Sequence, residues 1–160
     1  MRLTLIGVGR LKAGPERELF ARYFKRAADL GRAQGIAAVE LREIDESRAR
    51  RAEVRCAEEA RAIRAAIPAG AWLTLLDEGG AALTSRQWAV EIGRVRDGGA
   101  AAYALAIGGP DGFDPALKTE ARALVAFGAM TWPHQLVRAM ASEQLYRALS
   151  ILGGHPYHRD

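Results

Sequence analysis

Cysteine, lysine and long apolar runs are scarce in this chain of 160 residues, and each shortage narrows the possible classes of protein. Cys56 is the only cysteine, so the chain can form no internal disulfide, and a reducing cytoplasm is the expected compartment. No stretch approaches the ~20 apolar residues that a membrane helix needs. The apolar run near the N-terminus is short and broken by Gly7 and Gly9, unlike a secretory signal. We therefore expect a cytoplasmic protein with no membrane partner.

Several familiar catalytic and cofactor-binding patterns are also missing. The Gly7-Val8-Gly9 turn lacks the third glycine of a dinucleotide fingerprint, because Lys12 stands at that position, and the chain has no GK[ST] of a P-loop. No Ser-His-Asp or Cys-His arrangement is readable. His155 and His158 would make at most half of a metal site, and no cysteine or carboxylate pattern completes it. We therefore expect no metal.

The basic residues are nearly all arginine, since Lys12, Lys25 and Lys118 are the only lysines among 23 basic residues. The formal net charge is +4, and arginine offers a planar fork that binds phosphates and stacks on bases. This balance modestly favours a nucleic-acid partner. The arginine cluster between Arg48 and Arg55 is open to two interpretations: a solvated helix face offset by nearby glutamates, or a surface that contacts phosphates.

Hydrophobic periodicity and cap residues predict five strands alternating with five helices. Strands are expected at residues 2–8, 36–44, 72–76, 101–107 and 125–132, and helices at about 15–34, 47–66, 84–97, 115–123 and 133–152. Thr84 and Gln87 form a capping box, and Asp114 caps a helix that has Pro115 at its first position. Strict alternation is typical of a single α/β domain, residues 1–160, with a mostly parallel sheet flanked by helices. The uniformly apolar strand 101–107 is expected at its centre.

Two segments that follow strands have the character of ligand-binding loops. Residues 107–112 read IGGPDG, whose glycines let the backbone approach a ligand, although a tight turn explains them equally well. Residues 127–134 bring alternating apolar side chains and open backbone to the same edge of the sheet. That arrangement suits a flat purine ring but also an ordinary core strand. Open α/β sheets bind their ligands at this carboxyl edge.

The last helix and the tail concentrate the polar groups capable of chemistry. All three histidines lie in this part of the chain: His134, His155 and His158. Glu143 and Arg147 are four residues apart in the order that stabilises a helix. The tail, residues 153–160, begins with two glycines and continues HPYHRD. It is either a disordered terminus or a cover whose aromatic and cationic groups stack on a base and hold a phosphate.

Four motifs carry a family resemblance: IGGPDG, MTWPHQLVR, EQLYRA and HPYHR, in this order after the opening LTLIGVGRLK. In content and spacing they resemble the bacterial 23S rRNA pseudouridine N3-methyltransferases, a minimal family of the SPOUT class, over essentially the full length. The resemblance implies an enzyme that uses S-adenosylmethionine to methylate N3 of a pseudouridine in 23S rRNA. It also implies a homodimer, the assembled ribosome as the plausible substrate, and a deep C-terminal trefoil knot through which the last helix is threaded.

By motif position, the resemblance implies a cofactor site made of Leu76, Gly108, Phe127, Gly128, Ala129, Met130, Thr131 and Trp132. One departure is visible, because the family commonly has lysine where this chain has Ala81. The arginines from Arg48 to Arg55 are a candidate replacement for that charge.

Methylation of an imide nitrogen requires a group that takes its proton, and the candidates are His158, His134 and Glu143. The candidate substrate contacts are Arg138, Tyr157, His158 and Arg159. We hypothesise that the tail of one subunit covers the target base beside the cofactor of the other. Two alternatives stay open: a methyltransferase of the same class that acts on another RNA nucleotide, and a non-catalytic RNA-binding protein that uses the arginine helix and the tail.

Overall fold

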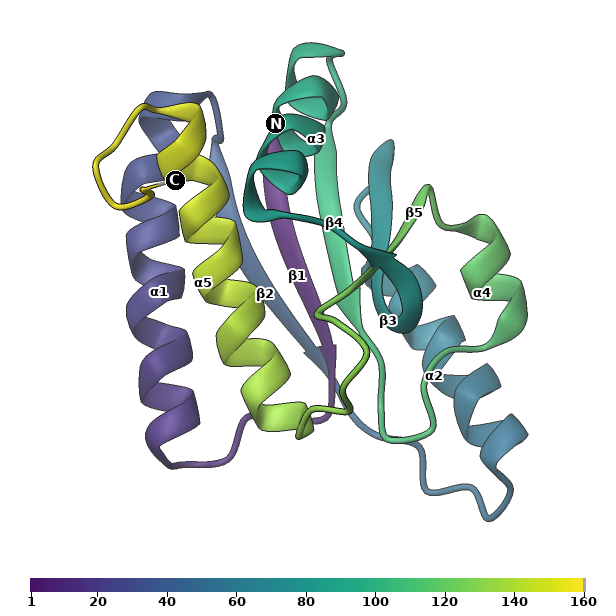
Figure 1. Ribbon diagram of the computed structural model, residues 1–160. Coiled ribbons are helices and arrows are strands. Elements are labelled where there is room, and N and C mark those ends of the chain that lie inside the picture. The colour runs from purple at the N-terminus through teal and green to yellow at the C-terminus, as the bar shows by residue number, and fades with distance from the viewer. Residues whose placement is uncertain (160) are drawn as a thin grey trace.

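Five parallel strands form the sheet at the centre of the computed structural model, which describes residues 1–159 (Figure 1). The strands are β1 (Arg2–Val8), β2 (Ala38–Ile44), β3 (Ala71–Ala82), β4 (Ala102–Ile107) and β5 (Ala123–Ala126). They lie in the order β2-β1-β4-β3-β5, and every neighbouring pair is parallel. The predicted α/β class with a parallel sheet is therefore confirmed.

Helices cover both faces of this sheet. They are α1 (Pro15–Gly31), α2 (Ala52–Ala66), α3 (Ser85–Asp97), α4 (Pro115–Glu120) and α5 (His134–Leu152), with a 3-10 turn, η1 (Arg32–Gln34), after α1. One apolar core cluster joins the sheet to α1, α3 and α5, and a second joins it to α2 and α4. Within the first layer, α5 packs against both α1 and α3 (Figure 1).

The central strand and two of the predicted caps are confirmed. β4 lies between β1 and β3, and all six of its residues are buried, because helices cover it on both sides. The Thr84 hydroxyl accepts a hydrogen bond from the Gln87 amide at 3.2 Å, and the Gln87 side chain accepts one from the Thr84 amide at 2.8 Å. The Asp114 carboxylate accepts one from the Ala116 amide at 2.9 Å. These bonds satisfy amides that a helix start leaves without partners.

The predicted end of the third strand at Leu76 is wrong, because β3 continues to Ala82 through an irregularity. Leu76 and Ala81 are both aligned with Val125 of β5, so residues 77–80 bulge out beside that strand. Gly80 lies so close to β5 that a Cβ atom there would fall 2.5 Å from the Val125 nitrogen. Only glycine fits this approach. The bulge carries the polar residues that follow Leu76 to the carboxyl edge of the sheet.

The last strand is shorter than predicted, since β5 ends at Ala126 and residues 127–133 form a loop. Gly128 has a φ of 94°, which breaks the extended backbone. The Trp132 indole donates a hydrogen bond to the Phe127 carbonyl at 3.2 Å and so closes the loop on itself. The Phe127 ring packs against Trp88 with centroids 6.1 Å apart. The apolar alternation in this segment therefore belongs to a folded loop.

The second helix begins at Ala52, later than the predicted start at residue 47. Residues 47–51 form a loop whose backbone finds other partners. The Ser47 amide donates to the Glu59 carboxylate at 3.0 Å, and the Arg55 guanidinium donates to the carbonyls of Ala49 at 2.9 Å and Arg50 at 3.0 Å. These bonds replace those that a helical turn would have supplied. The arginine cluster is thus divided between a loop and the start of α2.

For residues 1–159, the C-terminal trefoil knot stays a prediction. None of the described helices combines the length and the apolar character that a bilayer crossing requires. Within the same residues, no group of three or more His, Cys, Asp and Glu side chains is arranged to hold a metal ion.

Candidate active site

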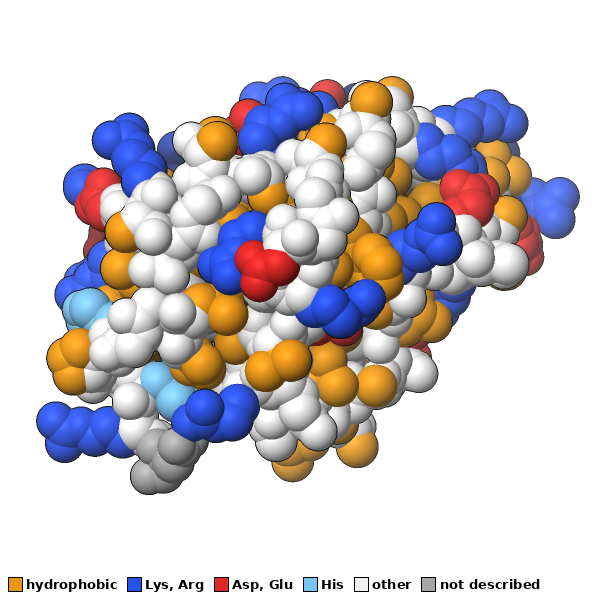
Figure 2. Space-filling view, turned by 90° about the horizontal axis from the view of Figure 1, so that it is seen from above, with side chains coloured by type: hydrophobic (Ala, Val, Ile, Leu, Met, Phe, Trp, Pro, Cys, Tyr) orange, Lys and Arg blue, Asp and Glu red, His pale blue; other side chains and the backbone are white. Residues whose placement is uncertain are grey.

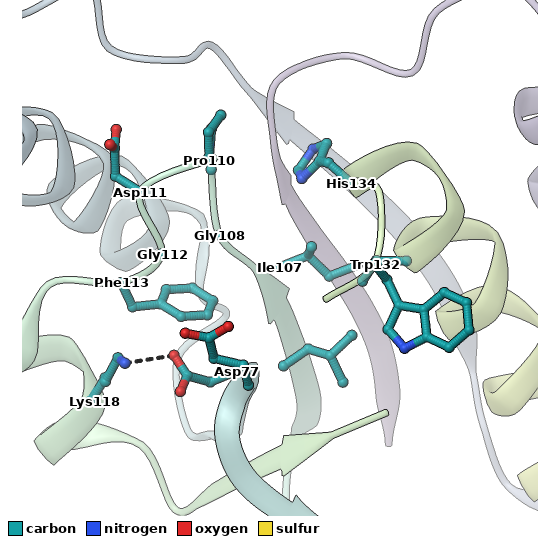
Figure 3. A pocket seen from close by; sticks show the side chains of 14 residues that line it. Asp77, Ile107, Gly108, Pro110, Asp111, Gly112, Phe113, Lys118, Trp132 and His134 are labelled. Atoms are coloured by element: carbon teal, nitrogen blue, oxygen red, sulfur yellow. Dashed lines mark ion pairs between the residues drawn. The ribbon is translucent and has the colours of Figure 1, made fainter. Parts of the chain in front are cut away.

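A cavity of 490 Å³ opens at the carboxyl ends of β3 and β4, where the sheet meets the start of α5 (Figure 3). Ile107 and Gly108 lie between an Asp77–Lys118 ion pair on one side and Trp132 and His134 on the other (Figure 3). The lining residues come from the end of β3, the glycine loop after β4, α4 and the start of α5: Leu76, Asp77, Glu78, Ile107, Gly108, Gly109, Pro110, Asp111, Gly112, Phe113, Lys118, Trp132, His134 and Val137. This is the edge at which open α/β sheets bind ligands.

The glycine loop, residues 108–112, is both a tight turn and a wall of the cavity. The Gly112 amide donates to the Gly109 carbonyl at 3.0 Å, and Gly112 has a φ of 78° that favours glycine. A Cβ atom on Gly108 would lie 3.0 Å from the Gly112 carbonyl oxygen. Residue 108 therefore has little room for a Cβ atom, and a larger side chain there would press on the loop itself. The tight turn is confirmed, and the same residues line the cavity, while their contact with a ligand stays a prediction.

Arg55 fastens the glycine loop to α2 from outside the cavity. Its guanidinium donates to both carboxylate oxygens of Asp111, at 2.6 and 2.9 Å, and this bonding lowers the pKa of the Asp111 carboxyl. Glu59 lies behind the loop, where a Cβ atom on Gly109 would fall 2.7 Å from its carboxylate, and burial raises the pKa of Glu59. No arginine from residues 48 to 55 lines this cavity, so none of them supplies the charge that Ala81 lacks.

A second cavity, of 140 Å³, adjoins the first and is formed mainly by the loop after β5. Leu76 and Trp132 line both cavities, and Gly108 lines the larger one. The remaining predicted cofactor positions that line the smaller cavity are Phe127, Gly128, Met130 and Thr131. Ala129 lines neither. The structure thus brings every predicted cofactor residue except Ala129 to the walls of two adjoining cavities.

Lys118 and Asp77 form an ion pair on the wall of the larger cavity. Lys118 Nζ lies 2.6 Å from Asp77 Oδ2, and the other Asp77 oxygen accepts the Gly79 amide at 2.9 Å. The Asp77 side chain is 7% exposed, whereas that of Lys118 is 37% exposed. Glu78, the next residue of the bulge, is exposed and lines both cavities. This wall therefore presents one ammonium and two carboxylates to a ligand.

His134 stands at the first position of α5 and lines the larger cavity. Its Nε2 atom is buried without a hydrogen-bond partner. Burial lowers the pKa of the imidazole below its usual value, and the Arg138 charge acts in the same direction. His134 thus lies beside the cavity with a pKa below its usual value and with a buried ring nitrogen that makes no hydrogen bond.

Arg138, a predicted substrate contact, has a side chain that is only 1% exposed. Its guanidinium donates to the Gly9 carbonyl at 2.6 Å and to Glu43 Oε1 at 2.9 Å. Glu43 Oε1 also accepts the Leu11 amide at 2.9 Å. All of these partners belong to the protein itself, and the contact of Arg138 with the substrate stays a prediction. Arg138 instead ties the turn after β1 and the end of β2 to the first turns of α5.

The tail folds back on α5 and α1, far from the cavity of its own chain. Tyr157 donates to Glu143 Oε1 at 2.8 Å, and its ring lies 4.6 Å from that of Tyr146. Arg147 donates to Glu143 at 2.9 Å and lies 3.3 Å from His158 Nδ1. Glu143 is nine residues along α5 from His134, or about 14 Å at the helical rise.

Two of the base candidates therefore lie beside Arg147: Glu143, near the middle of α5, and His158 of the tail. The third, His134, lies at the start of the helix. Arg159, a candidate substrate contact, is exposed beside the first two. Figure 2 looks onto the edge of the sheet opposite to the cavity, and there basic side chains lie around the margin and near the middle, interleaved with apolar ones.

Comparison with known proteins shows the family to which this chain belongs. The family model described as a predicted SPOUT methyltransferase matches residues 1–158. This chain belongs to the SPOUT methyltransferase family. A SPOUT relative from Methylocella silvestris, named ribosomal RNA large subunit methyltransferase H, is 57% identical over 160 residues and covers 100% of both chains. A protein of the same name from Beijerinckia indica subsp. indica is 56% identical over 159 residues and covers 99% of each.

Among solved structures, the SpoU methyltransferase AviRb from Streptomyces viridochromogenes, in complex with the cofactor AdoMet, aligns with a TM-score of 0.43. The sequence identity is 16%, and the alignment covers 94% of this chain and 57% of that chain.

Several residues in or behind the wall of the larger cavity had no readable sequence signal. Lys118 is an ordinary residue of a short helix, and only the fold brings it to the bulge of β3. Asp77 and Glu78 looked like part of a turn, although their position after a buried strand was a usable signal. The partnership of Arg55 with Asp111 joins residues 56 positions apart and could not be read from spacing.

Proposed function

We propose that this SPOUT protein methylates N3 of a pseudouridine in 23S rRNA, with S-adenosylmethionine as the methyl donor, in the cytoplasm. The observation that carries the proposal is the cavity at the carboxyl edge of β3 and β4, in a chain whose full-length relatives are named for methylation of large-subunit ribosomal RNA. Segments 76–78, 108–112 and 127–132 converge there.

The larger cavity fits this cofactor in size and lining. Its volume of 490 Å³ falls within the roughly 300–1,000 Å³ of small-molecule sites. Ile107, Phe113 and Val137 supply apolar surface, and the glycine loop supplies backbone groups without side chains in the way. An adenosine needs both, since its ring is flat and apolar on its faces and polar at its edges.

The charges of the cavity also suit the cofactor. Asp77, Glu78 and Asp111 line it, while Lys118 and the guanidinium of Arg55 pair with two of these carboxylates. One negative charge remains. S-adenosylmethionine carries a sulfonium and an ammonium against a single carboxylate, so its net charge is of the opposite sign, and attraction between the two favours binding.

His134 is the best-placed proton acceptor among the described residues of this site. The bound cofactor supplies a methyl group that is already activated by a sulfonium. The protein must hold the target nitrogen in line with that group and remove its proton. His134 lines the cavity, its Nε2 atom has no partner, and its lowered pKa keeps the imidazole neutral at physiological pH. We assign it the role of accepting the N3 proton.

We further infer that the protein acts as a homodimer on rRNA within the ribosome, with the tail of one copy over the cavity of the other. Met130, Trp132 and Leu136 expose apolar surface next to the cavity, and such surface favours contact with another chain. In this conformation the described part of the tail lines neither of the two adjoining cavities at the carboxyl edge of its own sheet. Tyr157 and Arg159 would offer a base-stacking ring and a cation to the substrate held by a second copy.

Methyl transfer to defined RNA substrates tests the proposed function. The purified protein would be incubated with S-adenosylmethionine and with free 23S rRNA, large subunits, assembled ribosomes or tRNA, and the products mapped by mass spectrometry. We expect one methyl group on N3 of a pseudouridine and no product when uridine replaces it. Methylation of another nucleotide would support the alternative enzyme of the same class. RNA binding without affinity for S-adenosylmethionine would support a non-catalytic protein and contradict the proposal.

A further inference from the structure

The pair formed by Asp77 and Lys118 is built in a way that leaves the lysine available to a ligand. Asp77 is nearly buried, and its two oxygens are occupied by Lys118 and by the Gly79 amide. The Lys118 ammonium has three donors and uses one of them on Asp77. Its side chain remains 37% exposed and lines the cavity (Figure 3). Asp77 thus fixes the position of the Lys118 ammonium, and two of the three N–H donors of that ammonium make no bond to Asp77.

The alternative role for this pair is to anchor α4 to the sheet, and other contacts already do so. Arg64 of α2 donates to both carboxylate oxygens of Glu120, at 2.7 and 2.9 Å, at the end of α4. Leu117 of the same helix is fully buried in the second core cluster. A pair facing the cavity adds little to an element that is held from the opposite side.

We propose that Lys118 and Glu78 bind the amino-acid end of S-adenosylmethionine, with Asp77 as the residue that positions Lys118. This inference rests on the proposed function and deepens it. The α-carboxylate accepts hydrogen bonds from the Lys118 ammonium, and the α-ammonium donates to the Glu78 carboxylate. Lys118 is the only lysine or arginine among the described residues that line the larger cavity, so a carboxylate has one place to bind there. The adenosine then lies along the glycine loop of the larger cavity and points towards Trp132, which lines both cavities.

The same arrangement explains how a chain with Ala81 keeps a cation at this edge of the sheet. Ala81 lies in the part of β3 that pairs with β5, just beyond the bulge. Lys118 reaches the bulge from α4 on the other side. A cation is thus present at the cavity although residue 81 does not supply one.

Binding calorimetry with two ligands tests this assignment. S-adenosylmethionine and its decarboxylated analogue differ only in the carboxylate that Lys118 is proposed to hold. We expect Lys118→Met to weaken binding of S-adenosylmethionine by on the order of tenfold or more, because a charge-assisted hydrogen bond is lost. Binding of the decarboxylated analogue should change less than about twofold. Glu78→Gln should weaken both ligands, since both carry the ammonium.

Lys25→Met is the matched control, because Lys25 also forms a 2.6 Å ion pair, with Asp29, on the surface of α1. It should leave both affinities unchanged. Equal losses for the two ligands in Lys118→Met would show a structural role and overturn the assignment, as would no loss at all. If Lys118→Met does not fold, Lys118→Arg replaces it, because it keeps the positive charge. This variant should bind both ligands, and an equal loss of affinity for the two would also overturn the assignment. Absence of any binding to the unchanged protein would instead contradict the proposed function, and this inference with it.

Discussion

The start of α5 and its second half, where the tail packs, differ in how completely their polar groups are satisfied. Where the tail packs, Glu143 is bonded to Arg147 and Tyr157, and Arg147 lies over the Tyr157 ring at 4.8 Å. At the cavity end, the buried His134 Nε2 has no partner and Lys118 has donors to spare. Groups held ready for a ligand are the ones that stay unsatisfied in the free protein. The proposed cofactor site therefore has polar groups without partners, whereas the tail is bonded to α5 and α1 of its own chain.

Removal of residues 155–160 should have the largest effect. It takes the aromatic and cationic cover away but leaves the cavity untouched. We expect methylation to fall by about 10²-fold or more, because an unpositioned base rarely reaches a reactive geometry. The affinity for S-adenosylmethionine, measured by calorimetry, should stay within about twofold. Full activity in the truncated protein would contradict a role for the tail.

A mixing experiment sharpens the same prediction. The truncated protein keeps a sound cavity, and a Gly108→Val protein keeps a sound tail. Co-expressed in one cell, they should form mixed dimers in which one cavity is served by one tail. Recovery of part of the activity would support action between copies, whereas two inactive proteins that stay inactive together would place the tail and the cavity in one chain.

Gly108→Val should damage the cavity end alone. Its side chain would press on the Gly112 carbonyl and on the Phe113 ring, 3.3 Å from the new Cβ atom. We expect cofactor affinity to fall by roughly 10- to 10²-fold, since overpacking costs about 1–3 kcal/mol and deforms the loop. Ala116→Val, on the exposed side of α4, is the control for an added β-branched side chain. Unchanged binding of S-adenosylmethionine would count against the site.

Arg55→Met should have a smaller effect on the same loop. It frees Asp111 and releases the glycine loop from α2, so the loop must be ordered again when the cofactor binds. We expect affinity to fall by about tenfold, with little change in thermal unfolding. Arg51→Met is the matched control, because Arg51 is exposed and pairs with Glu53 at 3.3 Å. If both variants bind equally well, the clamp has no part in cofactor binding.

The smallest effect concerns the dependence of stability on pH. The pKa of His134 is lower in the folded protein than the usual 6.5, so the unfolded chain binds more protons as pH falls below that value. The free energy of unfolding should therefore hold above pH 6.5 and decrease as pH falls towards the lowered pKa. His134→Gln should remove this part of the slope in denaturant titrations. An identical slope in the two proteins would show that His134 titrates normally.

Local signals predicted most of the fold, whereas contacts between distant segments decided the rest. β1 and the capped α3 were read correctly, because strand alternation and the Thr84–Gln87 box act within a few residues. The extension of β3 depends on the close approach of β5 to Gly80, which no pattern in the local sequence predicts. The end of β5 was predicted too late, because the apolar residues after Ala126 look like a strand although Gly128 turns them into a loop.

The candidate site followed the same division. The glycine loop and residues 127–132 were visible as loops at the carboxyl edge, but only the family resemblance made them a cofactor site. Arg138 was predicted from its place on a polar helix face, and its burial against Gly9 and Glu43 arises from packing of α5 on the sheet. The cation at the cavity was missed because Lys118 comes from a different helix than any motif indicated.

The length of α5 sets a fixed measure between the two halves of the proposed chemistry. His134, the proposed proton acceptor, stands at its first residue, and the tail packs on Glu143, nine residues or about 14 Å along the helix. In the proposed homodimer, a two-fold axis that crosses α5 between these two places would bring each cavity to the other copy's tail. Such a dimer would hold two complete sites and a lone chain none, so activity should depend on protein concentration as the dimer population does.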